Sequence, residues 1–293
     1  MSIRAEPFFL DSGEGQRFCL FYPAEGRLLH GHVLYIHPFA EEMNKARRMA
    51  ALQSRALAQA GFNVMQMDLL GCGDSAGDFG DATWQSWVDD VVQGCRYLQG
   101  RAPGHSPDKP PAPLWLWGLR AGCLLATQAA GQSGIACNFL FWQAPSLGQP
   151  LLNQFMRLRL AAGLQGAQTE GVMKSMRQQL DHGEPLDIAG YRLSKGLTQG
   201  LGQAALVPPA FQAPGQRLEW FESSTLENAS PSVVAAERFA QWQHAGFDAR
   251  LHMTRGPAFW QSTEIEESPA LISATTAAVR TCTQLTALKP AFP

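Results

Sequence analysis

The sequence predicts an α/β fold in which helices cover both faces of a mostly parallel, twisted sheet of about eight strands. Apolar runs alternate with amphipathic helical patterns, which is typical of strand–helix–strand units. Hydrophobic residues make up 45% of the 293 residues and charged residues only 16%, as in a chain with a sizeable core. Residues 150–210 interrupt the alternation with helical patches and no clear strand. We therefore expect a core from residues 1–149 and 211–293, with 150–210 as a helical cap over the ligand crevice.

The expected strands are apolar runs that end at turns rich in glycine, proline or serine. They cover residues 17–22, 32–37, 62–69, a run that begins at 114, 137–143, 217–222 and 248–253. The expected helices cover residues 44–60, 83–99, a stretch of small residues from 121, 231–244 and a last stretch from about 268. Gly61 is a suitable stop for the first helix. Ser230 is the expected cap of the fourth, with Pro231 as its first residue.

The most informative motif is Gly-Leu-Arg-Ala-Gly at positions 118–122, between an apolar strand and a helix of small residues. Its frame is that of the nucleophile elbow G-x-S-x-G, a sharp strand-to-helix turn that presents a catalytic serine. Here Arg120 stands in the place of the serine. A guanidinium stays protonated and has no lone pair for attack, so serine-type acyl transfer from this position is excluded.

The order of the motifs resembles that of the α/β-hydrolase superfamily over nearly the whole chain. A His-Pro-Phe loop at 37–39, a Gly-Cys-Gly-Asp-Ser turn at 71–75, the elbow, the cap and an acid-bearing strand end follow one another as in that family. The run HPFAEEMNK at 37–45, Arg120 and Phe-Trp-Gln at 259–261 further resemble the exosortase A system-associated hydrolase type 2 family. This resemblance implies a bacterial protein encoded with exopolysaccharide and protein-sorting genes, whose hydrolase label rests on the fold.

The other members of a catalytic triad are incomplete as well. In this superfamily the base is a histidine after the last strand, and residues 254–261 contain none. The histidines beyond the elbow are expected in the cap, at a helix end and inside a strand: His182, His244 and His252. Glu222, at a strand end, is the candidate acid, with Glu227 as a second. Cys123, one helical turn past the elbow, is a weaker candidate nucleophile and is expected to be a buried core thiol.

Part of an anion site can be built from backbone groups alone. The superfamily's oxyanion hole uses the N–H after the elbow residue, here Ala121, and one from the first loop, here Phe39 or Ala40. With Arg120 at a helix N-terminus, these donors describe a site for a carboxylate or phosphate. Because a guanidinium buried alone is too costly, the alternative is an internal carboxylate partner from the acidic loop 41–42, with Glu41 as the first expectation. The residues expected to line the same pocket are His37, Glu42, Ser146 and Trp260.

Composition argues against several classes of partner. The formal net charge of −2 gives no electrostatic reason for a nucleic-acid partner. No run approaches the roughly 18 apolar residues of a membrane span, and the first residues lack the apolar core of a signal peptide. Six scattered cysteines without C-x-x-C spacing indicate reduced, buried thiols. We therefore expect a cytoplasmic protein without a metal or cofactor.

Three functions stay open on the sequence alone. The first is a non-catalytic protein with a degenerate triad, which binds a small anionic or acyl ligand or acts as a scaffold of the exopolysaccharide system. The second is an ester or thioester hydrolase with a relocated site, in which Arg120 stabilises charge and Glu41, Glu42, Glu222 or Cys123 does the chemistry. The third is a subunit that binds a protein partner of that system through the cap or the loop 100–113.

Overall fold

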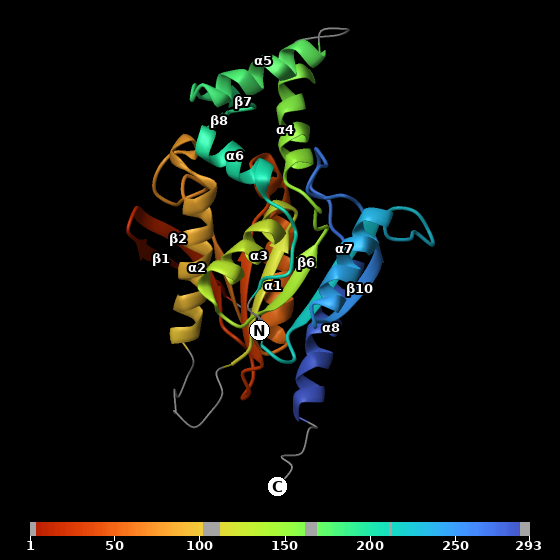
Figure 1. Cartoon of the computed structure of the whole chain (residues 1–293). Coiled ribbons are helices and arrows are strands. Elements are labelled where there is room, and N and C mark those ends of the chain that lie inside the picture. The colour runs from red at the N-terminus through yellow and green to blue at the C-terminus, as the bar shows by residue number, and fades with distance from the viewer. Residues whose placement is uncertain (1–3, 102–111, 162–168, 211–212, 288–293) are drawn as a thin grey trace.

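An eight-stranded, mostly parallel sheet forms the centre of the molecule (Figure 1). The computed structural model describes residues 4–101, 112–161, 169–210 and 213–287. The strands of this sheet are β1 (Glu6–Ser12), β2 (Gly15–Tyr22), β3 (Gly31–Ile36), β4 (Phe62–Met67), β5 (Leu114–Leu119), β6 (Asn138–Trp142), β9 (Arg217–Ser224) and β10 (Asp248–Arg255). Their order is β1-β2-β4-β3-β5-β6-β9-β10, and β2 runs in the opposite direction to the other seven strands. The expected α/β architecture is confirmed.

Helices cover both faces of the sheet, and the central strands are therefore buried on both sides. β3 and β5 are buried along their whole length, as inner strands of a parallel sheet are. The covering helices are α1 (Glu41–Gln59), α2 (Trp84–Gly100), α3 (Ala121–Ser133), α7 (Val233–His244) and α8 (Pro269–Ala287). Val33 of β3 belongs to a hydrophobic cluster with α1 and α8, and Leu34 to a second cluster with α2, α3 and α7.

Between β6 and β9 the chain leaves the sheet and forms an insertion. The insertion contains α4 (Gln149–Ala161), α5 (Thr169–Asp181), the hairpin strands β7 (Leu186–Ile188) and β8 (Tyr191–Leu193), and α6 (Lys195–Gln203). These elements gather at one end of the sheet, where α6 packs against α2 (Figure 1). The sequence shows no clear strand in residues 150–210, but the structure forms the two short strands β7 and β8 there. Three-residue strands are too short to show a period, and the Ala-Gly turn at 189–190, with positive φ at both residues, is their local signal.

The first strand and the first helix also differ from expectation. β1 is not predicted from the sequence because, at the sheet edge, its residues are exposed or half-buried and their alternation is weak. α1 begins at Glu41, three residues earlier than expected, so Glu41 and Glu42 lie in a helical first turn and not in a loop. The helix dipole favours acidic side chains at that end.

The start of α7 lies two residues further along the chain than expected. Ser232 is its cap, and the Ser232 side chain accepts a hydrogen bond from the first turn of the helix. Ser230 and Pro231 therefore precede the helix. The expected loop 100–113 lies mostly outside the described residues. None of the described helices combines the length and the apolar content that a membrane crossing requires.

Candidate functional site

β5 runs into α3 through a turn with the geometry of a nucleophile elbow. Arg120, at the apex, has a φ of 54° and a ψ of −117°, a strained conformation for a residue with a side chain. The two motif glycines are required by close approach of the main chain. A Cβ on Gly118 would lie 2.5 Å from the backbone nitrogen of Cys123, and one on Gly122 would lie 2.1 Å from a carbonyl oxygen of β3. The elbow frame is therefore intact, with an arginine at its apex.

A second turn of the same shape lies beside the elbow. Ala40 has a φ of 51° and a ψ of −124°, and it precedes α1 as Arg120 precedes α3. The N-termini of these two helices meet, since the side chains of Glu42 and Arg120 are in contact. Phe39, Ala40 and Ala121, the expected oxyanion donors, belong to these two turns. Their binding of an anion stays a prediction.

An ion pair closes the elbow. Arg120 Nη2 lies 3.3 Å from Glu42 Oε1, and Arg120 Nε donates to the same oxygen at 3.3 Å. Nη2 also donates to Gln154 Oε1 of α4 at 2.9 Å. The side chains of Arg120 and Glu42 are only 13% and 8% exposed. The expectation of Glu41 as the partner is wrong: successive helical residues point about 100° apart, and Glu42 is the one that faces the elbow.

Burial dominates the protonation of both acidic residues at the start of α1. Burial raises the pKa of Glu42 to about 7, and the neighbouring Arg120 offsets only part of this effect. Burial likewise raises the pKa of Glu41. Glu41 Oε2 is buried without a hydrogen-bond partner among the described residues. The positive charge of Arg120 is therefore balanced inside the protein once Glu42 is ionised.

Little space remains beside this ion pair. The cavity there has a volume of about 10 Å³, which is close to the minimum that one water molecule needs. Its lining residues come from the loop before α1, from α1 and from α4: Phe39, Glu41, Glu42, Leu151, Gln154 and Phe155. The rings of Phe39 and Phe155 pack edge to face with centroids 5.2 Å apart. Side chains of the insertion thus fill the region in front of the elbow.

Three residues expected to line the pocket do not line this cavity. His37 is buried at the end of β3, where its Nε2 accepts a hydrogen bond from the main chain after β4 at 3.3 Å. Burial lowers the pKa of His37, which favours a neutral imidazole. The Ser146 carbonyl accepts a main-chain hydrogen bond from the segment after α6. Trp260 is buried against Phe259 in the cluster beneath α1 and α8.

The histidine nearest the base loop has a partner of its own on the sheet. His252 lies within β10, where its Nε2 is 2.7 Å from Glu219 Oε2. Its ring stacks on Phe221 with centroids 4.4 Å apart. His244 ends α7, as expected, and its Nδ1 lies 2.8 Å from a carbonyl oxygen of the same helix. Both rings therefore have local structural contacts.

Neither candidate acid is among the hydrogen-bond or ion-pair partners of Arg120 that the described residues provide. Glu222 is buried in β9, burial raises its pKa, and none of the ion pairs among the described residues includes it. Glu227 forms an exposed ion pair with Arg255 at 3.0 Å. No hydrogen bond or ion pair within the described part of the chain joins either carboxylate to a histidine. Their catalytic role stays a prediction that no contact supports.

Cys123 is a core thiol and not an exposed nucleophile. Its side chain is 0% exposed, and Sγ donates to the Gly118 carbonyl at 3.2 Å. Burial raises its pKa, so the reactive thiolate is strongly disfavoured. The structure therefore contradicts Cys123 as the relocated nucleophile.

Gln154 and Phe155 are the site residues that the sequence does not predict. The apolar spacing in LLNQFMRLRL predicts a helix, but it does not tell where that helix lies on the core. No local signal connects Gln154 with Arg120, 34 positions earlier. Within the part of the chain that the structure describes, no three His, Cys, Asp or Glu side chains are placed to share a metal ion.

Solved structures with this fold include esterases and a lipase. The ferulic acid-bound Est1E from Butyrivibrio proteoclasticus is 14% identical, with a TM-score of 0.64 over 96% of this chain and 100% of that chain. A soluble variant of the Saccharomyces cerevisiae monoglyceride lipase, in complex with a substrate analogue, is 13% identical, with a TM-score of 0.65 over 97% and 96%. At these identities the similarity shows the fold alone.

The sequence itself matches one family description. No curated protein matches the sequence. Residues 29–179, just over half of the chain, match the family model described as serine aminopeptidase, S33. This stretch runs from the start of β3 through the elbow to α5, and so contains both strained turns. The chain therefore belongs to the serine aminopeptidase S33 family, within the α/β-hydrolase fold.

Proposed function

We propose that this protein has a degenerate catalytic triad and acts as a binding or scaffolding component, not as a serine hydrolase. The observation that carries the proposal is the contact of Arg120 with Glu42 and Gln154. Once Glu42 is ionised, the charge of Arg120 is balanced internally, and such an arginine attracts an anionic ligand weakly. A volume of about 10 Å³ beside it leaves no room for an acyl group. The internal partner therefore favours a scaffold over an anion site at the elbow.

We also propose the cellular setting that the sequence resemblance implies. In this view the protein is a cytoplasmic member of the exosortase A system-associated hydrolase type 2 family, with a protein partner in the exopolysaccharide system. The support is that Glu42, from the run HPFAEEMNK, and Arg120 are both part of that resemblance and contact each other. The ion pair gives a physical reason for both residues, because the charge of each balances the charge of the other.

The proposed division into a core (residues 1–149 and 211–293) and a cap (150–210) rests on the way the insertion joins the sheet. β6 and β9 are parallel neighbours, so the chain leaves and re-enters the sheet at adjacent strands. An isolated bridge between Leu147 and Ala205 closes the base of the insertion. The described residues of the segment between these two positions add no strand to the central sheet.

The proposal is tested by active-site labelling. The full chain is treated with a fluorophosphonate probe, beside an active serine esterase as a positive control, and its peptides are analysed by mass spectrometry. We expect no adduct on the peptide that carries residues 114–133 and no turnover of p-nitrophenyl acetate above that of the heat-denatured chain. An adduct on the elbow helix refutes the proposal.

A second candidate function is an ester or thioester hydrolase with Glu42 as the general base. The observation that favours it is the pKa of about 7, which suits a base at neutral pH. It predicts turnover of a thioester such as acetyl-CoA that falls by about 100-fold or more in Glu42→Gln and in Arg120→Ala. Turnover that is absent, or equal in wild type and both variants, removes this candidate.

A further inference from the structure

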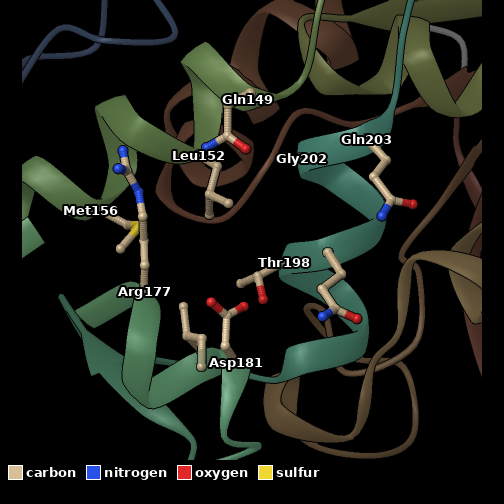
Figure 2. A pocket seen from close by; sticks show the side chains of 10 residues that line it. Gln149, Leu152, Met156, Arg177, Asp181, Thr198, Gly202 and Gln203 are labelled. Carbon is tan, nitrogen blue, oxygen red and sulfur yellow. The ribbon is translucent and has the colours of Figure 1, made fainter. Parts of the chain in front are cut away.

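Helix α4 presents two different faces, and only one of them closes the elbow. Leu151, Gln154 and Phe155 line the small cavity beside Arg120. Gln149, Leu152 and Met156 line a second cavity, which has a volume of about 510 Å³ and lies between α4, α5 and α6 (Figure 2). Gln154 and Phe155 follow Leu151 by three and four residues, and Leu152 and Met156 follow Gln149 by three and seven, as expected for two faces of one helix. The larger cavity is thus a feature of the insertion alone.

The floor of this cavity is apolar and its walls are polar. Leu152, Met156 and Leu180 are all buried and form the apolar part. The polar part combines three amides, a hydroxyl, one guanidinium and one carboxylate: Gln149, Gln199, Gln203, Thr198, Arg177 and Asp181. Figure 2 shows Leu152 and Asp181 pointing toward each other across the opening. The volume lies within the range of about 300–1,000 Å³ that is typical of small-molecule sites.

Two of the polar side chains are already held in place. Asn153 Oδ1 accepts hydrogen bonds from Gln149 Nε2 and from Arg177 Nη2, both at 2.9 Å. This bridge ties α5 to α4 at one edge of the cavity. Gln149 Oε1 lies so close to α6 that a Cβ on Gly202 would be 2.8 Å from it. The small residue at 202 thus gives this amide its place at the wall.

The carboxylate of Asp181 has no such tie. Arg177 precedes it by one helical turn, at a spacing that commonly forms an ion pair. The guanidinium turns to Asn153 instead. Among the hydrogen bonds and ion pairs of the described residues, none involves the Asp181 carboxylate. Asp181 is exposed to solvent, and its carboxylate borders the cavity without a donor from the described residues.

The charge and polarity of the lining exclude three ligand classes. An anion would meet Asp181, and a cation would meet Arg177, so a ligand with a net charge gains on one side what it loses on the other. An alkyl chain would offer no hydrogen bond to the Asp181 carboxylate or to the amides of Gln199 and Gln203. An uncharged ligand with many hydroxyl groups avoids both costs. Each hydroxyl is both donor and acceptor, as each glutamine amide is.

We propose that the cavity between α4, α5 and α6 binds an uncharged, hydroxyl-rich small molecule of the saccharide class. The carboxylate of Asp181 accepts from ligand hydroxyls, and the amides of Gln149, Gln199 and Gln203 donate and accept around them. The apolar floor takes the C–H face of a sugar ring. This site goes beyond the proposed function, since it needs no chemistry at Arg120.

The test is a binding measurement on the full chain. Maltose, cellobiose and N,N′-diacetylchitobiose are titrated separately and followed by calorimetry and saturation-transfer NMR. We expect at least one of the three to bind at millimolar concentration or below. Asp181→Ala should weaken that binding by about tenfold or more, and Gln203→Ala by about threefold to tenfold. Gln178→Ala, on the same helix as Asp181 but not in the cavity lining, is the matched control and should bind as wild type does.

Three outcomes overturn the inference. One is that none of the three disaccharides binds at millimolar concentration. Another is binding that the Asp181→Ala and Gln203→Ala variants, folded by circular dichroism, leave unchanged. The third is that a blocked tripeptide, N-acetyl-trialanine amide, binds at this cavity while the sugars do not. Fluorophosphonate labelling of the elbow would refute the proposed function and leave this result untouched, so the two failures can be told apart.

Discussion

Glu42→Gln should make folding stability less dependent on pH, because it removes a buried carboxyl whose ionisation is unfavourable. The ordinary pKa of 4.5 rises to about 7 in the folded protein, chiefly through burial. Below about pH 4.5 the carboxyl is protonated in the folded and the unfolded state alike. Between the two pKa values only the folded state keeps the proton. The free energy of unfolding therefore falls as the pH rises, and the fall is complete above about pH 7.

The magnitude follows from the two pKa values. Each pH unit between them corresponds to about 1.36 kcal/mol, so the whole fall is about 3 kcal/mol. A comparison between about pH 5 and about pH 8 captures about 2 kcal/mol of it. The Glu42 side chain is 8% exposed, so solvent screening reduces the effect only slightly. Glutamine keeps an oxygen that can accept from Arg120, so the variant removes the titration and retains the contact.

The assay is urea unfolding followed by the fluorescence of the eight tryptophans. From about pH 5 to about pH 8, the stability of Glu42→Gln relative to wild type should rise by about 2 kcal/mol. Glu227→Gln is the matched control, because Glu227 forms an exposed ion pair with Arg255. The stability of this variant relative to wild type should change by less than about 0.5 kcal/mol between the two pH values. The reasoning would be refuted if the difference in the free energy of unfolding between Glu42→Gln and wild type were the same at both pH values. It would also be refuted if that difference changed in favour of wild type as the pH rises.

Three further predictions concern the elbow and its surroundings. Arg120→Ala leaves Glu42 buried without its cation and should cost about 3 kcal/mol of stability at about pH 8 but much less at about pH 5, in the same urea assay; an equal loss at both pH values would contradict this. Gly122→Ala places a Cβ 2.1 Å from a main-chain oxygen and should cost about 2–3 kcal/mol in thermal unfolding. Gly171→Ala on α5, with no atom within 4 Å, is its control and should stabilise by about 0.5–1 kcal/mol. Cys123 should resist a thiol reagent in the native protein and react after unfolding, as mass spectrometry of its peptide can show; rapid modification of the native protein would count against its burial.

Local sequence patterns predict the parts of the fold that depend on local physics. Buried parallel strands such as β3 and β5 are continuous apolar runs, which makes them visible. The edge strand β1 and the three-residue strands β7 and β8 lack such a signal, and they are the strands that sequence reasoning does not find. The cap of α7 is misplaced by two residues because Ser230 and Ser232 are equally suitable chemically, and the fold selects Ser232.

The candidate site also has one part that the local sequence predicts and one part that it does not. A tight strand-to-helix turn requires glycine at 118 and 122. The motif therefore predicts the elbow independently of how the rest of the chain folds. The partner of Arg120 is different. Electrostatics requires a carboxylate, and the first turn of α1 offers two, at Glu41 and Glu42. Which of them faces the arginine depends on where that helix begins, and this is decided at Ala40.

The sequence by itself determined the α/β architecture, the elbow and the loss of a serine nucleophile, because strand burial, glycine sterics and the chemistry of a guanidinium are local properties. Only the tertiary structure decided that Arg120 pairs with Glu42 and Gln154 in a cavity of about 10 Å³. It likewise decided that the opposite face of α4 borders about 510 Å³ of space. The physical reason is that both depend on how α4 packs against elements far away in the chain, and helical periodicity carries no information about its partners.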